Sequence, residues 1–199
     1  MGYPNNKKVI DPLQFAKLCW PDVQFYDKQR EVIYSVCNNT ETVAVAGNML
    51  GKDFVAGFIA LWFFISRQPC RIVTTSVKDA HLDVLWGEMK NYIQTSIYDL
   101  SLEVTADNIY KLIDGHRCPI SYVKRLVSSA DTVQSFQGHH VAQIGDSIPK
   151  TLVIGDEASA LSDAMYDMVR PWANRRLWIG NPWDCSNFFY RAVMGGVTP

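Results

Sequence analysis

Residues 42–53, TVAVAGNMLGKD, are typical of a buried strand that runs into a phosphate-binding loop. Largely apolar residues come first, a loop with Gly47 and Gly51 follows, and Lys52 then precedes an apolar run, Phe54–Ile65, of helical length. Such a loop offers phosphate oxygens the backbone N–H groups of a helix start, and the lysine adds a compact positive charge. The stretch therefore predicts a site for a nucleoside triphosphate.

Two positions depart from the usual loop pattern, G-x-x-x-x-G-K-[S/T]. Ala46 stands where the first glycine is expected, and Asp53 stands where a serine or threonine would offer its hydroxyl to Mg²⁺. The Asp53 carboxylate could bind the metal itself, or it could be a helix-start acid favoured by the helix dipole. The loop residues expected to bind the nucleotide are Gly47, Asn48, Met49, Leu50, Gly51, Lys52 and Asp53.

A second motif lies further along the chain, where the apolar run at 151–155 ends in Asp156 and Glu157. The carboxyl ends of parallel strands meet at one edge of a sheet, so these carboxylates would lie beside the phosphate loop. We expect Asp156 to hold Mg²⁺ and Glu157 to act as the general base that orients the attacking water. The two motifs together predict a Mg²⁺-dependent ATPase, with ATP and Mg²⁺ as its cofactors and Lys52 as a catalytic residue.

Three further residues are candidates for nucleotide contacts. Tyr26 and Gln29 precede the loop and could recognise adenine, since a ring stacks on the base and an amide can hydrogen-bond its edge. Asn181 follows a predicted strand at 175–179 and could bind the γ-phosphate or the attacking water, which would make it catalytic. The alternatives are an ordinary amphipathic helix with Gln29 on its exposed face, and a turn residue before proline for Asn181.

The remaining pattern predicts a three-layer α/β fold with a mostly parallel sheet. Residues 71–76 are typical of a second buried strand and residues 78–95 of an amphipathic helix. Short alternating runs at 108–113 and 118–123 indicate an antiparallel hairpin at the sheet edge. We expect residues 124–129 to form a separate return strand.

The composition fits one globular domain. Of 199 residues, 48% are hydrophobic and 12% aromatic, and the formal net charge of −1 gives no general sign of nucleic-acid binding. Five scattered cysteines favour free thiols, and the longest apolar run is too short to cross a bilayer. We expect residues 1–24 to be a lead-in with one short helix at 13–18, and residues 25–199 to be the domain.

Taken in order, these motifs resemble the ATPase domain of the large terminase subunit, the DNA-packaging motor of tailed bacteriophages. Each motif alone occurs among the wider RecA-like, additional-strand catalytic-Glu ATPases. The likeness covers most of residues 25–190 and rests on Tyr26 with Gln29, the degenerate loop 47–52, the strand 71–76, Gly138, Asp156-Glu157 and Gly180-Asn181-Pro182.

The resemblance implies an ATP-driven translocase that moves double-stranded DNA into a procapsid in the host cytoplasm, with no membrane involved. It implies three partners besides DNA: the portal protein, the small terminase subunit, and further copies in a homo-oligomeric ring. It also implies a carboxy-terminal nuclease domain, whose acidic metal cluster is absent from this sequence. We therefore expect either a truncated chain or a separately encoded ATPase domain.

The resemblance also raises the question of an arginine finger. The family often carries an arginine inside the phosphate loop, and residues 48–50 offer none. We expect a finger supplied by a neighbouring subunit, with Arg125 as the first candidate and Arg170 or Arg175 behind it.

Two other functions stay open. A helicase-like ATPase would need further motifs after this domain. A non-hydrolysing nucleotide-binding scaffold is credible because Asp53 replaces the usual hydroxyl residue, although such a scaffold has no need of Glu157.

Overall fold

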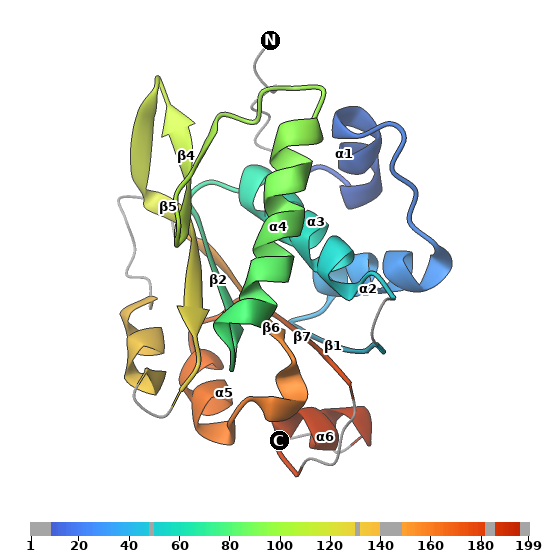
Figure 1. The fold of residues 1–199 in the computed structure, drawn as a ribbon, viewed down its shortest axis with the longest axis vertical. Helices are drawn as coiled ribbons and strands as arrows, with labels where there is room; N and C mark the ends of the chain where they lie inside the picture. The colour runs from blue at the N-terminus through green and yellow to red at the C-terminus, as the bar shows by residue number, and fades with distance from the viewer. Residues whose placement is uncertain (1–8, 48–49, 130–131, 140–148, 182–185, 196–199) are drawn as a thin grey trace.

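The protein has an α/β architecture built around one sheet (Figure 1). The computed structural model describes residues 9–47, 50–129, 132–139, 149–181 and 186–195. Within these, the sheet has seven strands in the order β1-β7-β6-β2-β5-β4-β3. The strands are β1 (Glu41–Val45), β2 (Cys70–Ser76), β3 (Leu102–Val104), β4 (Asn108–Ile113), β5 (His116–Val127), β6 (Lys150–Asp156) and β7 (Arg175–Gly180).

The five strands from β1 to β5 in this order are parallel, whereas β4 and β3 extend the sheet in antiparallel fashion. The expected mostly parallel sheet with an antiparallel edge hairpin is therefore confirmed. The separate return strand at 124–129 was wrong, because β5 runs without a break to Val127. Its pairing with β2 continues from Arg71 opposite Tyr122 to Ser76 opposite Val127.

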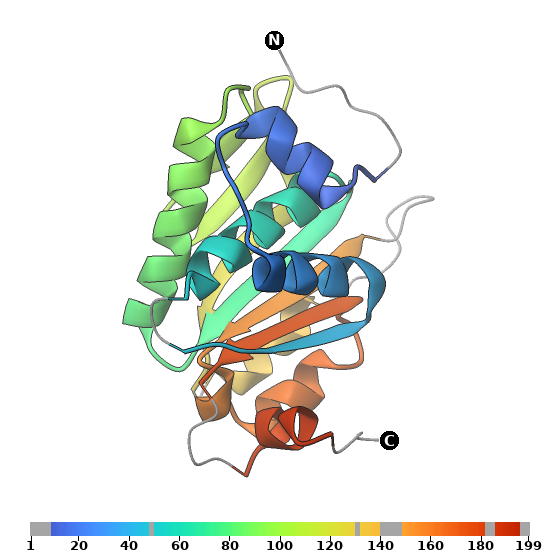
Figure 2. The ribbon, with the colours of Figure 1, turned by 90° about the vertical axis from the view of Figure 1, so that its right-hand side faces the viewer.

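Helices cover both faces of the sheet and make the three predicted layers (Figure 2). One face carries α1 (Pro12–Cys19), α2 (Asp27–Asn38), α3 (Lys52–Ile65) and α4 (Asp79–Thr95). The other face carries the 3₁₀ helices η1 (Val133–His139) and η2 (Ala158–Ala160) with α5 (Asp163–Val169) and α6 (Phe188–Val193). In the described part of the chain, no helix is long and apolar enough to cross a membrane.

Two hydrophobic cores follow from the alternation of side chains along the parallel strands. Ile72 and Leu152 belong to the core under α1–α4, whereas their neighbours Val73 and Val153 belong to the core under η1, α5 and α6. Ten residues of α3 are buried, so this helix lies almost wholly inside the first core.

The strand order has a direct consequence for function. β7 is inserted between β1, which leads into the phosphate loop, and β6, which ends in the acidic pair. The register sets Asp156 opposite Ile179 and Gly180 opposite Val45. The carboxyl ends of all three strands therefore meet at one edge, where ligands of open parallel sheets bind.

Candidate nucleotide-binding site

The phosphate loop connects β1 to α3, as the sequence predicted. Gly51 has φ +68°, in the left-handed region, and a Cβ there would also lie 3.0 Å from Nε2 of Gln29. Only glycine adopts this conformation without strain, so Gly51 lets α3 begin directly at Lys52. The first-turn N–H groups of α3 have no partners within the helix and can bind an anion. Asn48 and Met49, expected nucleotide contacts, lie outside the described residues.

Lys52 joins the two motifs. Its ammonium group hydrogen-bonds the carboxylate of Asp156, and lies 3.2 Å from Oε1 of Glu157 and 3.6 Å from Oδ1 of Asp53. The lysine side chain is only 10% exposed and that of Asp156 only 5%. The structure thus brings together four of the residues that the sequence singled out.

The charges of this cluster shift its proton affinities. Burial by itself favours the neutral amine of Lys52, but the hydrogen bond to Asp156 and the charges of the three carboxylates together outweigh it and raise the lysine pKa above 10.5. Burial, followed by the charge of Asp156, raises the pKa of Asp53 above its ordinary value, against the opposing effect of Lys52. The cluster therefore favours the charged form of Lys52 and disfavours the charged form of Asp53.

The carboxylates fit Mg²⁺ only in combination with a nucleotide. Within the described residues, no three His, Cys, Asp or Glu side chains are arranged to hold a metal by themselves. Protein-bound Mg²⁺ usually takes one or two carboxylates together with waters and substrate phosphates. Because Asp53, Asp156 and Glu157 already gather around one cationic group, the chemistry of the site suits a metal brought in by a triphosphate.

Glu157 occupies a constrained backbone position directly after β6. Its φ and ψ are both 50°, a left-handed conformation that is uncommon for a residue with a side chain. The turn packs tightly on β7, since a Cβ at Gly180 would lie 2.8 Å from the amide nitrogen of Ala158. A Cβ at Gly155 would overlap the ring of Trp178. These two glycines allow the close packing that fixes the direction of the Glu157 side chain.

The segment that follows Glu157 is fastened to the start of α6, a contact that the sequence did not indicate. Nδ2 of Asn187 lies 3.0, 3.0 and 2.7 Å from the carbonyl oxygens of Ala158, Ser159 and Leu161. Bonds between a side chain and a distant backbone leave no local pattern in a sequence. Asn187 thus holds the turn that carries Glu157.

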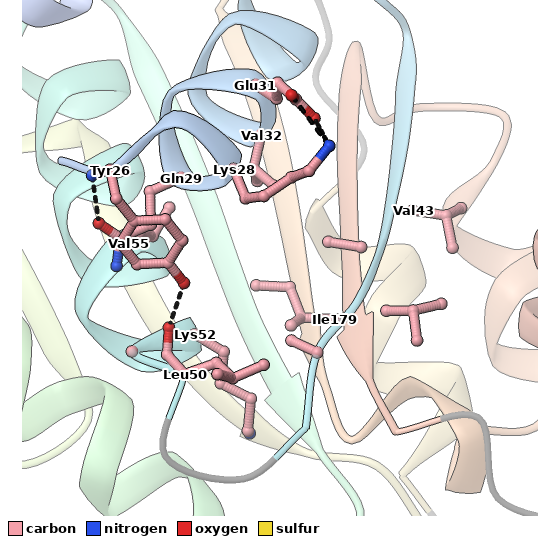
Figure 3. Close-up of a pocket in the computed structure, with 14 residues that line it drawn as sticks. Tyr26, Lys28, Gln29, Glu31, Val32, Val43, Leu50, Lys52, Val55 and Ile179 are labelled. Carbon is pink, nitrogen blue, oxygen red and sulfur yellow. Dashed lines mark hydrogen bonds and ion pairs between the residues drawn. The ribbon is translucent and has the colours of Figure 1, made fainter.

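A pocket of about 740 Å³ opens beside the loop, between α2, β1 and the start of α3 (Figure 3). This volume falls within the range of small-molecule sites. Its walls are apolar at Val32, Ala44, Val55 and Ile179 and polar at Gln29 and Lys52. A planar base and a phosphate chain can therefore occupy opposite ends of the same pocket.

Tyr26 and Gln29 line this pocket, and each side chain forms a hydrogen bond with the backbone around it (Figure 3). The Tyr26 hydroxyl donates to the carbonyl oxygen of Leu50 at 2.7 Å, which links the start of α2 to the phosphate loop. Oε1 of Gln29 accepts from the Tyr26 amide at 3.3 Å, and this glutamine is 8% exposed. The alternative of Gln29 on the exposed helix face is therefore wrong, and its Nε2 group faces Gly51.

The pocket also contains residues that the sequence did not single out. Lys28 and Glu31 line it and form an ion pair of 2.8 Å on α2. Their spacing of three residues shows that they share a helix side, but only the packing of α2 on β1 shows that this side borders the pocket.

Asn181 and Arg125 differ in their placement. Asn181 lies at the end of β7, with its Oδ1 3.9 Å from the position of a Cβ on Gly47, and so beside the phosphate loop. Arg125 lies on β5 with its guanidinium 2.7 Å from Asp79 and 2.8 Å from Asp83, both on α4. To act as a finger, Arg125 would first have to leave these two carboxylates.

The strand order with β7 inserted, the loop after β1 and the acidic pair after β6 define a P-loop NTPase fold of the RecA-like type. No model of a protein family and no curated protein matches the chain. Among solved structures, it is similar to the large terminase ATPase domain of Thermus phage P74-26, at 16% identity and a TM-score of 0.58, covering 89% of this chain and 72% of that one.

Two further structures have the same fold. A single-residue mutant of the P74-26 ATPase domain matches at 16% identity and a TM-score of 0.61, again covering 89% of this chain and 72% of that one. The large terminase of bacteriophage HK97 matches at 14% identity and a TM-score of 0.57, covering 83% of this chain but only 35% of that one. The fold that the sequence resemblance implied, that of terminase ATPase domains, is confirmed.

Proposed function

We propose that the protein is a Mg²⁺-dependent ATPase that serves as the motor domain of a viral DNA-packaging terminase. The observation that carries this proposal is the convergence of Lys52, Asp156 and Glu157 at the carboxyl edge of the sheet. The fold shared with phage terminase ATPase domains supports it.

Each residue of the cluster has a role in this proposal. Lys52 leaves the carboxylates and binds the β- and γ-phosphates, together with the first N–H groups of α3. Asp156, with Asp53 beside it, holds Mg²⁺, which neutralises phosphate charge when bound. Glu157 accepts a proton from the attacking water, and Asn181 hydrogen-bonds the γ-phosphate or that water.

The base end of the pocket provides the specificity. The aliphatic side chain of Val32 can contact a flat ring, and Tyr26 offers its half-exposed ring for stacking. Nε2 of Gln29 is the donor available to the base, since Oε1 already accepts from the backbone. ATP is therefore the proposed substrate.

The biological setting is part of the same proposal. The protein would move double-stranded DNA into a procapsid in the host cytoplasm, in a homo-oligomeric ring on the portal protein together with a small terminase subunit. Residues 25–199 would form the motor domain. A finger from the neighbouring subunit, with Arg125 as first candidate, would complete each site, so hydrolysis per subunit should rise on assembly.

A second candidate function rests on Asp53. A carboxyl group with a raised pKa in place of a hydroxyl ligand weakens the case for metal binding, which favours a non-hydrolysing nucleotide-binding scaffold. A helicase-like ATPase has no comparable observation in its favour.

Phosphate release from ATP, measured with and without Mg²⁺ over a range of protein concentrations, tests the proposal. We expect Mg²⁺-dependent turnover that rises with protein concentration, and a changed Mg²⁺ requirement in Asp53→Thr. If the wild type binds ATP but does not turn it over at any concentration, the proposal is wrong and the scaffold is the better account.

A further inference from the structure

Two consecutive residues, Phe25 and Tyr26, connect the start of α2 to the start of α3 and to the phosphate loop. Phe25 is buried, and its ring centre lies 5.6 Å from that of Phe54 and 4.7 Å from that of Phe58, both on α3. Aromatic pairs at these distances attract each other in addition to burying apolar area. Phe25 thus anchors the chain at Tyr26 beside the phosphate loop.

Tyr26 has one polar contact through its backbone and another through its side chain. Oε1 of Gln29 accepts from the Tyr26 amide at 3.3 Å and so holds the backbone at the start of α2. The tyrosine is 51% exposed, yet its hydroxyl donates to the carbonyl oxygen of Leu50 at 2.7 Å (Figure 3). The exposed ring is therefore tethered to the phosphate loop by its hydroxyl group.

The bond from Tyr26 sets the direction of the peptide group between Leu50 and Gly51. This peptide bond is trans, and in a trans peptide group the C=O and the N–H point in opposite directions. Because the Leu50 carbonyl oxygen is turned toward Tyr26, the Gly51 N–H points away from Tyr26. Among the described residues this N–H donates to no acceptor, so it is available to a phosphate oxygen.

Gly51 gains more from such a contact than another residue would. Glycine populates several backbone regions with similar ease, so the residue itself does not fix the direction of its N–H. A donor that must be ordered when the ligand arrives costs affinity, whereas a donor that is already oriented does not. The hydrogen bond from Tyr26 to Leu50 therefore prepares the Gly51 N–H for binding.

We propose that Tyr26 is a positioning residue for the phosphate loop, whose hydroxyl holds the Leu50 carbonyl group and thereby presents the Gly51 N–H to the phosphates. This role is separate from base stacking, which uses the face of the ring and not the hydroxyl. One side chain then serves both ends of the pocket. The inference rests on the proposed function, because it takes the loop to bind phosphates.

The test separates the hydroxyl of Tyr26 from its ring. Tyr26→Phe keeps the ring for stacking and removes only the donor to Leu50. Calorimetry in the presence of Mg²⁺ measures the affinity for ATP, for GTP and for inorganic tripolyphosphate, which has no base. We expect all three ligands to bind about three- to fivefold more weakly, as for the loss of one hydrogen bond, with the ratio of ATP to GTP affinity unchanged.

The control is Tyr34→Phe, which removes the same atom from another partly exposed tyrosine of α2 that does not line the pocket. We expect this variant to bind all three ligands as the wild type does. Thermal melting of both variants separates an effect on the loop from an effect on the stability of the fold.

Weaker binding of ATP by Tyr26→Phe without weaker binding of tripolyphosphate would overturn the proposal, since the hydroxyl would then act on the base. Equal weakening in both variants would overturn it too. So would a lower melting temperature of Tyr26→Phe with wild-type affinities, because the bond would then serve stability alone. ATP hydrolysis is measured separately: a wild type that binds tripolyphosphate but hydrolyses no ATP contradicts only the proposed function.

Discussion

The ammonium group of Lys52 hydrogen-bonds the carboxylate of Asp156, and this contact unites two motifs that lie 104 positions apart in the chain. Both side chains are almost buried. Removing one partner of a buried ion pair leaves a charge that is poorly solvated and unpaired, whereas removing both does not. We therefore expect the pair to affect the stability of the fold in addition to its proposed role in the chemistry.

This pair predicts a stability pattern. We expect Lys52→Met to lower the free energy of unfolding by about 3 kcal/mol, and the double variant Lys52→Met with Asp156→Asn to recover a large part of the loss. Urea unfolding of the two single variants, the double variant and the wild type measures the coupling. Strictly additive losses would show that the contact contributes nothing beyond its separate residues.

Asp53 predicts opposite effects on stability and on activity. The pKa of Asp53 is higher in the folded protein than the unfolded value of 3.8. Because this carboxyl group then ionises more easily in the unfolded chain, the folded protein loses stability as pH rises through 3.8 toward the folded pKa. Asp53→Asn should therefore stabilise the protein at pH 7, and this gain should shrink as pH falls toward 4. If the Asp53 carboxylate binds Mg²⁺, the same variant should need a higher Mg²⁺ concentration for hydrolysis. Urea unfolding over this pH range measures the effect on stability, and hydrolysis over a series of Mg²⁺ concentrations measures the effect on activity.

Gln29 predicts base selectivity. Losing one hydrogen bond to the base costs about 1 kcal/mol, so Gln29→Ala should bind ATP roughly fivefold more weakly and discriminate less against GTP. Gln14→Ala, which changes an exposed glutamine on α1, is the matched control. Equal losses for ATP and GTP would mean that Gln29 only caps α2 and supports the loop.

Asn187 predicts a change in turnover with unchanged nucleotide affinity, because its amide fixes the carbonyl groups that follow Glu157. Asn187→Asp keeps an oxygen to accept from the Tyr190 amide at the start of α6 and loses the donors. We expect kcat to fall about tenfold, with the Kd for ATP close to wild type. A loss of thermal stability with kcat unchanged would assign Asn187 a structural role only.

The sequence predicted the parts of this protein that depend on local pattern. The loop with Gly51 and Lys52, the strand before Asp156 and the helices expected at 54–65 and 78–95 all leave local periodicity or a compact motif. The error at residues 124–129 is instructive, because half-buried and polar positions such as Lys124 interrupt the apolar pattern although the backbone pairing continues.

Features that depend on contacts between distant segments could not be predicted from the sequence. The exposed helix side suggested for Gln29 was wrong because burial depends on how α2 packs against the loop. In the same way, no spacing rule indicates that Asn187 holds the turn after Glu157, or that Arg125 is paired with Asp79 and Asp83 on α4.

Hydrolysis by a variant that lacks only the proposed base tests the central claim most directly. Mg²⁺-dependent phosphate release should fall at least a hundredfold in Glu157→Gln, in line with the contribution of a general base, while ATP binding is retained. Glu88→Gln, a carboxylate on α4 away from the site, should match the wild type. Equal rates for Glu157→Gln and the wild type would contradict the account, because Glu157 would then take no part in the chemistry.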